Sequence, residues 1–156
     1  MDNYNIMEIF VTNAKKNQID IIADFQIKMA LETENIKLSY KNIIKGVEAV
    51  FNDKTKGQYY IAKYNNKIIA SLLTTYEWSD WRNAYYLWIQ SLYVIKDYRN
   101  KKVFKTMYNH LKNIVSQSDK YAGIRLYVDK SNINAINVYN KIGMNNDHYL
   151  FFEWLK

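Results

Sequence analysis

The spacing of apolar residues changes partway along the chain, and this change constrains the fold more than any other feature. Apolar side chains recur at helical spacing over residues 17–35 and again from Ser39 to about Phe51. Beyond that point they are spaced as in strands, in the segments "QYYIAKYNNKIIASLLTTYEW" and "AYYLWIQSLYVI". Two helices followed by three strands favour an α/β domain with a mixed sheet.

The remaining segments extend this order of elements. Residues 4–11 alternate enough to form a first strand, and Asn65 and Asn66 suit a turn between strands because asparagine tolerates positive φ. A helix is expected from about Asn100 to Val115, and its spacing places Val103, Met107, Leu111 and Ile114 inward. A strand is expected at "AGIRLYVD", a short helix at "SNINAINVYNKIGM" with Ser131 or Asn132 as its cap, and a last strand at "HYLFFEWL". The expected order is β-α-α-β-β-β-α-β-α-β.

Composition limits the classes of protein that the chain can belong to. Its 156 residues include no proline, four glycines and no recognisable repeat or linker, so we expect one domain over residues 1–156. The absence of cysteine excludes disulfides, thiolate catalysis and cysteine-ligated metals. His110 and His148 lie far apart without neighbours at metal-ligand spacing, so no metal is expected. No signal peptide and no run of about 20 apolar residues is visible, so we expect a cytoplasmic protein without a membrane partner.

The net charge of +7 has two explanations. It favours an anionic partner such as a nucleic acid, a membrane surface or a phosphorylated small molecule. It also fits the abundance of lysine and asparagine that an AT-rich genome produces, so charge alone decides nothing. The basic residues show no array on one face and no strand of the RNP type, so a nucleic-acid partner is not expected.

Positive charge gathers in "RNKKVFK", where a strand is expected to lead into a helix. Lysines at a helix start oppose the macrodipole and cost a few tenths of a kcal/mol each. A pyrophosphate that accepts hydrogen bonds from the N–H groups of about Lys101 to Lys105, with charge from Arg99, would remove this conflict. The alternative is a solvated basic turn that is tolerated at small cost.

The same stretch carries a resemblance to a known family. "LYVIKDYRNKKVF", followed one strand later by "NINAINVYNKIGM", resembles the GNAT superfamily of N-acetyltransferases, which use acetyl-CoA. The family pattern is a strand, a loop reading Q/R-x-x-G-x-G/A, a helix, a strand and then N-x-x-A-x-x-x-Y-x-K-x-G-F. The matching residues are Arg99, Asn132, Ala135, Tyr139, Lys141 and Gly143. The front part resembles a bacterial branch of this superfamily whose substrates are mostly unassigned. The implied fold is a mixed, mostly antiparallel twisted sheet flanked by about four helices.

The match has a gap at the two small positions of the loop, which hold Lys102 and Phe104. Glycine there lets the backbone approach a phosphate closely. Lys102 keeps its N–H, and in ordinary helical φ/ψ nothing forbids that approach. Phe104 fits if its ring turns toward the core.

The resemblance implies a role for each matching position. The backbone of Leu92, Tyr93 and Val94 would bind the pantetheine arm, and an N–H near Val94 would polarise the thioester carbonyl. Asn132 would bond to the arm and Tyr139, which on its own would suggest only a packed aromatic residue, would be the general acid for the thiolate. The implied cofactor-binding set further includes Arg99, Asn100, Lys101, Lys102, Val103, Phe104, Lys105, Ala135 and Lys141.

The acceptor side is less defined by the pattern. Tyr127 occupies the position where some members carry a glutamate base, so no base is assigned. Acidic residues expected near the acceptor are Glu32 and Glu34, together with Glu77 and Asp80, and Trp78 and Trp81 could form an aromatic wall beside a cation. Each acid could instead be solvated and each tryptophan could cap the sheet. These residues favour a small cationic amine as acceptor.

Two other functions stay open at this point. The missing loop glycines suit a GNAT-fold protein that binds CoA or a partner without catalysis. The charge suits a nucleic-acid module, against which the lack of a basic array on one face counts. Many GNAT proteins dimerise, so a homodimer is possible by association with the family.

Overall fold

The computed structural model of the chain describes residues 7–156, and along the sequence these residues divide after Arg125 into two compact units. In the first unit the strands are β1 (Phe10–Asn13), β2 (Gln58–Tyr64), β3 (Lys67–Ser79), β4 (Ala84–Val94) and β5 (Tyr121–Arg125). Its α-helices are α1 (Ile19–Glu34), α2 (Tyr40–Asn52) and α3 (Val103–Ser116). The second unit holds α4 (Ile133–Lys141). Single-turn 3-10 helices occupy Lys16–Gln18, Lys54–Lys56 and Lys96–Tyr98.

The five strands form one mixed sheet in the order β1-β2-β3-β4-β5. Neighbouring strands from β1 to β4 are antiparallel, and β5 runs parallel to β4. Asn65 and Asn66 join β2 to β3 with φ values of 46° and 63°, as their tolerance of positive φ predicted. The mixed sheet and the four α-helices confirm the expected fold class.

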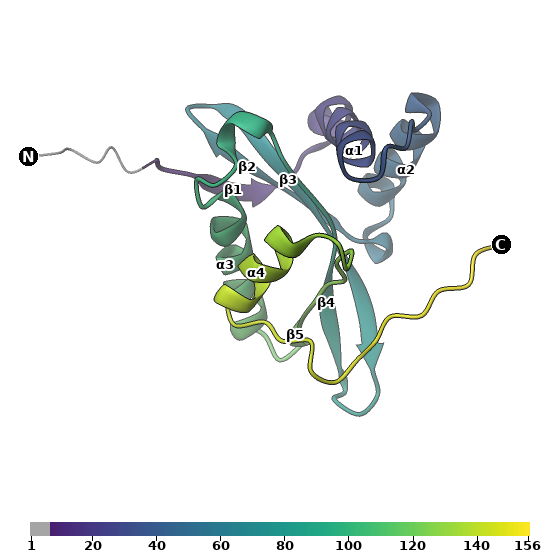
Figure 1. The fold of residues 1–156 in the computed structure, drawn as a ribbon, viewed down its shortest axis with the longest axis vertical. Helices are drawn as coiled ribbons and strands as arrows, with labels where there is room; N and C mark the ends of the chain where they lie inside the picture. Colours follow the sequence, from purple (N-terminus) through teal and green to yellow (C-terminus); the bar gives the residue numbers. More distant parts are fainter. Residues whose placement is uncertain (1–6) are drawn as a thin grey trace, which may run out of the picture. The chain divides into compact units, whose positions relative to one another are not determined.

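Helices cover both faces of the sheet, with α1 and α2 on one face and α3 on the other (Figure 1). On the first face, Ile22, Val47 and Ile61 are buried in one cluster. On the second face, α3 buries three of the four residues that its spacing predicted to face inward, Val103, Met107 and Leu111, almost fully. The fourth, Ile114, is half-buried. His110, from the same helix, packs edge-on against Tyr60 with ring centroids 5.6 Å apart.

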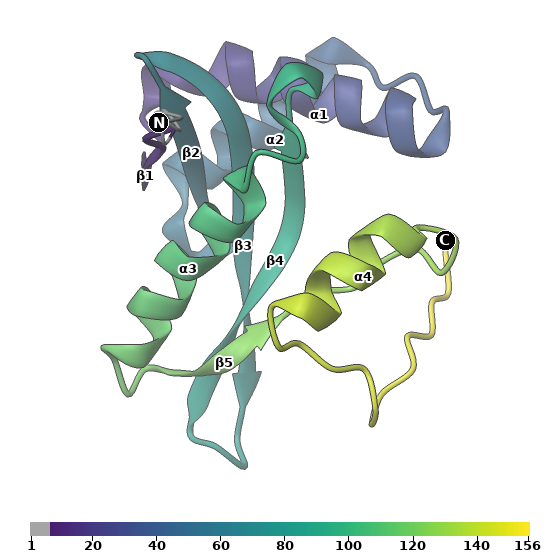
Figure 2. The ribbon, with the colours of Figure 1, turned by 60° about the vertical axis from the view of Figure 1, so that its left-hand side comes forward.

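The pairing of β4 with β5 covers only the first part of β4 (Figure 2). It runs from the pair Tyr85 and Tyr121 to the pair Trp88 and Arg125. Beyond Trp88, β4 continues to Val94 and pairs with β3 alone among the described strands. The last six residues of β4, 89–94, therefore have an edge that no described strand covers.

Several of the expected elements and boundaries were wrong. The first strand was expected at residues 4–11, of which 4–6 lie outside the described residues, and β1 instead spans Phe10–Asn13. The strand expected at 122–129 ends at Arg125, where the first unit ends. The last expected strand is absent, because residues 148–155 join no strand of the described sheet. Several large apolar side chains there are exposed, including Tyr149, Phe152 and Trp154.

Candidate active site

The uncovered edge of β4 carries the backbone groups that the family resemblance assigned to the pantetheine arm. The N–H of Ile95 donates to the carbonyl of Ile69, so its backbone faces β3. Because successive residues of a strand direct their N–H and C=O groups to opposite edges, the groups of Val94 and Leu92 face the uncovered edge. The carbonyl of Val94 accordingly accepts a hydrogen bond from Arg99 Nε at 2.9 Å instead of pairing with β3. By the same alternation, the backbone of Tyr93 faces β3.

The loop after β4 ends in a left-handed residue at the start of α3. Lys102 is the N-cap of the helix with φ 63° and ψ 11°, and Asn100 has φ 60°. The expectation of helical φ/ψ at Lys102 and of a helix start near Asn100 was therefore wrong. Residues with a Cβ rarely adopt φ > 0, and glycine is the default there. The family pattern asks for glycine at this position, and the lysine present adopts the glycine conformation.

The first turn of α3 offers backbone donors toward this loop. Thr106 N–H donates to the carbonyl of Lys102 at 2.9 Å, which is the first bond of the helix. In an α-helix the N–H groups of the first turn, which here come before Thr106, have no carbonyl four residues earlier within the helix. The Phe104 ring is half-buried, and its centroid lies 5.9 Å from that of the Tyr108 ring. The donor set suits a pyrophosphate.

Arg99 has partners within the protein. Its Nη2 donates to Glu32 Oε2 at 2.6 Å, and its guanidinium lies 5.5 Å from the centroid of the Tyr93 ring. Tyr93 Oη donates to Glu32 Oε1 at 3.0 Å, and Lys96 Nζ lies 3.7 Å from the same oxygen. Burial raises the pKa of Glu32, but hydrogen bonds from Arg99 and Tyr93 and the charges of Arg99 and Lys96 outweigh it and place this pKa below its usual range. Glu32 is thus a fixed carboxylate that joins α1 to the loop after β4.

Glu77 is also paired with an arginine, near the other end of β4. Its carboxylate forms an ion pair with Arg125 of β5. The Arg125 guanidinium stacks on Tyr86, 3.6 Å from the ring centroid, and Tyr86 is the cross-strand neighbour of Glu77. No sequence pattern marked Arg125 or Tyr86 as partners, because the pairing depends on the register of three strands.

The acidic and aromatic residues of the β3–β4 turn do not form one cluster. Glu77 and Trp78 are adjacent in β3, so their side chains point to opposite faces of the sheet. Trp78 packs edge-on against Tyr85, with ring centroids 4.9 Å apart. Trp81 is 94% exposed. Asp80 accepts a hydrogen bond from the N–H of Trp81 at 2.9 Å. Glu32 contacts the far end of β4, so the structure separates the predicted acceptor residues into distinct groups.

In the second unit, α4 carries the second motif in the expected helical frame. Asn132 is the N-cap, and its side-chain oxygen accepts from the N–H of Ala135 at 3.1 Å. Gly143 follows the helix with φ 87°, a conformation that favours glycine. Burial raises the pKa of Tyr139, so its hydroxyl holds its proton at neutral pH. Lys141 lies in the last turn of this helix.

Residues 7–156 hold neither a metal-binding cluster nor a helix that could span a membrane. Within this range no group of three or more histidine, aspartate or glutamate side chains could hold a metal ion. None of the helices in this range has both the length and the apolar character that a membrane span needs.

Comparison of the chain with known protein families and solved structures identifies its family. A model described as the acetyltransferase (GNAT) family matches residues 26–144. The chain belongs to the GNAT acetyltransferase family. A solved structure described as a possible acetyltransferase from Clostridium difficile 630 is 40% identical, with a TM-score of 0.88 over 95% of this chain and 97% of that one. A search of curated proteins gives no match.

More distant GNAT structures share the fold. A ribosomal-protein-alanine N-acetyltransferase from Brucella melitensis biovar Abortus 2308 is 11% identical, with a TM-score of 0.77 over 96% of this chain and all of that one. An aminoglycoside N-acetyltransferase in complex with CoA is 9% identical, with a TM-score of 0.77 over 96% of each chain. These likenesses extend over nearly the whole chain, and so the GNAT fold does too.

Proposed function

We propose that this GNAT protein transfers the acetyl group of acetyl-CoA to a primary amine of a small acceptor, by direct attack in a ternary complex and within a single acetyltransferase domain. The observation that carries the proposal is the uncovered edge of β4 leading into the donor-rich start of α3. The edge suits an amide-containing arm, and the N–H groups of residues 103–105 suit a pyrophosphate.

The proposed reaction uses backbone and side-chain groups of this chain. When bound, acetyl-CoA supplies a thioester whose acetyl group passes from sulfur to the amine nitrogen. The N–H of Val94 or Leu92, at the uncovered edge, is the donor that would polarise the carbonyl. The amide nitrogen of Asn132 is the donor for the arm, because the side-chain oxygen already caps α4. Tyr139 is the general acid that gives its proton to the departing thiolate, while the amine loses one.

The acceptor class is proposed from the family and from the groups near β4. The structures of GNAT relatives include enzymes named for aminoglycosides and for a ribosomal protein, so amines of different size are accepted across the fold. Both Glu32 and Glu77 are already paired with arginine, so the preference for a cationic amine rests on Asp80 and on Trp81, which is exposed in the β3–β4 turn.

The test is acetyl transfer to a panel of amines, namely polyamines, amino sugars, amino acids and peptide N-termini. Release of the CoA thiol and the mass of the product would be measured for the wild type, for Tyr139→Phe and for the control Tyr121→Phe. Loss of a general acid costs about 10²–10⁴-fold in rate, so Tyr139→Phe should lose turnover while it keeps its affinity for acetyl-CoA. The control Tyr121→Phe should keep both its turnover and its affinity.

The alternative is a GNAT-fold protein without catalysis, which Lys102 and Phe104 at the two small positions favour. It predicts binding of acetyl-CoA without transfer to any amine of the panel. Equal turnover in the wild type and Tyr139→Phe would instead contradict the proposed general acid.

A further inference from the structure

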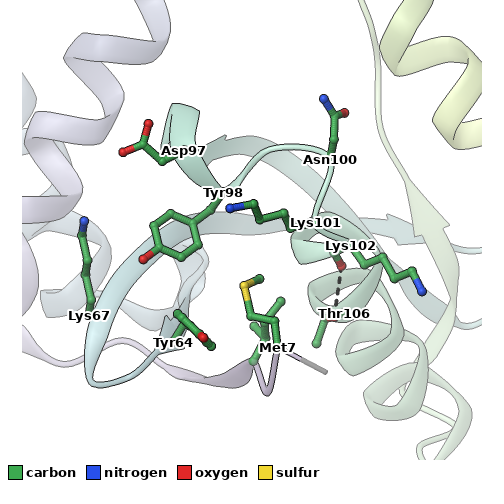
Figure 3. A pocket seen from close by; sticks show the side chains of 10 residues that line it. Met7, Tyr64, Lys67, Asp97, Tyr98, Asn100, Lys101, Lys102 and Thr106 are labelled. Carbon is green, nitrogen blue, oxygen red and sulfur yellow. Dashed lines mark hydrogen bonds between the residues drawn. The ribbon is translucent and has the colours of Figure 1, made fainter. Parts of the chain in front are cut away.

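The uncovered edge of β4 has different groups at its two ends. At one end it leads into the proposed pyrophosphate loop, residues 95–102, beside which a pocket of about 940 Å³ lies (Figure 3). In this pocket Lys67 Nζ and Lys101 Nζ lie 5.4 and 5.3 Å from the centroid of the Tyr98 ring. At the other end, β5 begins to cover β4. Side chains at that second end are the ones that an acceptor can meet without contacting the loop.

Arg125 lies at this second end of the uncovered edge. It is the last residue of β5 and pairs with Trp88, the last residue of β4 that β5 covers. Leu92, whose N–H faces the uncovered edge, follows Trp88 by four positions, which span about 13 Å in an extended strand. Arg125 is thus near the proposed reaction site along the strand but does not reach it.

The Arg125 guanidinium is held from two sides. It stacks on the Tyr86 ring, 3.6 Å from the centroid, and its Nη1 donates to the Glu77 carboxylate. Tyr86 lies in turn against Gly123 of β5, where a Cβ would come within 3.3 Å of the ring. The side chain of Arg125 is nevertheless 30% exposed and that of Glu77 40%. The guanidinium is therefore fixed in orientation and still accessible to a ligand.

Glu77 lies on the face of the sheet that α1 and α2 cover farther along. Leu73 of β3 packs against the buried cluster beneath these helices, and Glu77 follows it by four positions, so alternation places both side chains on one face. The β3–β4 hairpin extends beyond α1 and α2 (Figure 2). Because α3 covers the opposite face, Glu77 and the guanidinium paired with it meet an acceptor that approaches from the side of α1 and α2.

A guanidinium fixed in this way suits a carboxylate, because its planar fork of N–H donors matches the two carboxylate oxygens. We propose that Arg125 binds a carboxylate of the acceptor, while a distal primary amine of the same molecule attacks the thioester near Leu92. The gap of about 13 Å along β4 favours groups that are several bonds apart, as in an α,ω-diamino acid. Glu77, beside Arg125, gives the pair the two charges that complement an α-carboxylate and an α-ammonium group.

This inference rests on the proposed function and narrows its acceptor. The bond changes are those of the proposed transfer: the acetyl group leaves sulfur and forms an amide with the distal nitrogen, which loses a proton. A diamino acid also keeps a net positive charge, so it agrees with the preference for a cationic acceptor.

The test compares free lysine with lysinamide, which lacks only the negative charge. Values of kcat/KM with acetyl-CoA would be measured for the wild type, for Arg125→Met and for the control Arg82→Met, which removes an exposed arginine of the β3–β4 turn. Loss of a charged hydrogen bond costs about tenfold in affinity or more. The wild type and Arg82→Met should therefore prefer lysine by about that factor, and Arg125→Met should lose the preference. The mass spectrum of the product should place the acetyl group on the distal amine.

Two results would overturn the proposal: equal kcat/KM for lysine and lysinamide in the wild type, or the same preference in Arg125→Met as in Arg82→Met. Thermal unfolding of each variant checks that it is folded. If Arg125→Met is not, Arg125→Gln, whose amide can still donate to Glu77, takes its place. Calorimetric titration of lysine and lysinamide into each protein, with CoA present, gives the same comparison without turnover.

Failure of this inference is distinct from failure of the proposed function. Equal acetylation of lysine and cadaverine, which is lysine without its carboxylate, would keep the transferase and remove the role of Arg125. Acetylation of no amine would remove the transferase. In that case calorimetric binding of lysine that exceeds the binding of lysinamide and depends on Arg125 would keep the carboxylate site, and equal binding of the two would remove it as well.

Discussion

Arg99 Nη2 lies 2.6 Å from Glu32 Oε2, which joins the end of α1 to the loop between β4 and α3. The same guanidinium donates through Nε to the carbonyl of Val94 at 2.9 Å. One side chain thus holds together the last residue of β4, the proposed pyrophosphate loop and α1. Arg99 is at the family's Q/R position, and in this chain it positions the edge of β4 that would face the cofactor.

Substitution of Glu32 tests how much its pairing with Arg99 contributes to the free energy of unfolding. The pair is partly exposed, with side-chain exposures of 41% for Arg99 and 22% for Glu32, so we expect a coupling of about 1 kcal/mol or less. The measurement is a double-mutant cycle of Glu32→Gln and Arg99→Met by urea unfolding. A matched cycle at the exposed pair of Asp24 and Lys28 should give a smaller value. Equal coupling in both cycles would show that the Arg99 pair has no special role.

The same carboxyl should make stability depend on pH. Its pKa in the folded protein lies below 4.5, so the unfolded state binds the proton more readily. The stabilisation by Glu32 is therefore complete above the unfolded pKa and is lost as the pH falls through the lower folded pKa. We expect the difference in unfolding free energy between wild type and Glu32→Gln to be constant above about pH 5.5 and to shrink toward pH 3. A difference that grows on acidification would contradict the assignment.

Lys102→Gly should stabilise the protein. Lys102 holds φ 63°, a conformation that costs a residue with a Cβ about 1 kcal/mol relative to glycine, and the change also removes a cation from the start of α3. Thermal unfolding should show a rise in Tm. The control Lys105→Gly, inside the helix, should lower Tm, because glycine in a helix interior costs about 0.5–1 kcal/mol of stability. A fall in Tm for Lys102→Gly would mean that the lysine stabilises this turn through contacts of its own.

Gly57→Ala should be strongly destabilising. Gly57 has φ 146°, and a Cβ there would lie 2.2 Å from the carbonyl oxygen of Thr74 on β3. The start of β2 would have to move away from β3, at a cost of about 2 kcal/mol or more. Gly46→Ala is the matched control, since a Cβ there meets nothing within 4 Å and alanine favours the interior of α2. Chemical denaturation of both variants would check the prediction, and equal stabilities would contradict it.

The sequence predicted the parts of the fold that depend on periodicity and on local turn chemistry. The apolar spacing of α3 identified Val103, Met107 and Leu111 as core residues, and the Asn65-Asn66 turn has the positive φ values that asparagine permits. Asn132, one of the two cap residues that the sequence offers for α4, is its N-cap. The left-handed φ of Lys102 was missed because a lysine gives no local reason to expect it.

Contacts between distant segments could not be predicted from the sequence. The pairing of Glu32 with Arg99 spans 67 positions, and that of Glu77 with Arg125 spans 48. Both depend on strand register and helix placement, which periodicity does not determine. The same holds for Lys67 and Lys101 on either side of Tyr98, whose proximity follows from the pairing of β3 with the end of β4.

Thermal unfolding of the purified protein with and without acetyl-CoA tests the central claim most directly, because the claim requires a cofactor site at the edge of β4 and the start of α3. A ligand present at 100 times its dissociation constant adds about 2.7 kcal/mol, which corresponds to a rise in Tm of roughly 5–10 °C at this size. We predict a rise of that order, which acetate at the same concentration does not produce. An unchanged Tm at millimolar acetyl-CoA would show that the strained Lys102 and the ring of Phe104 close the site, and would contradict the proposed acetyl transfer.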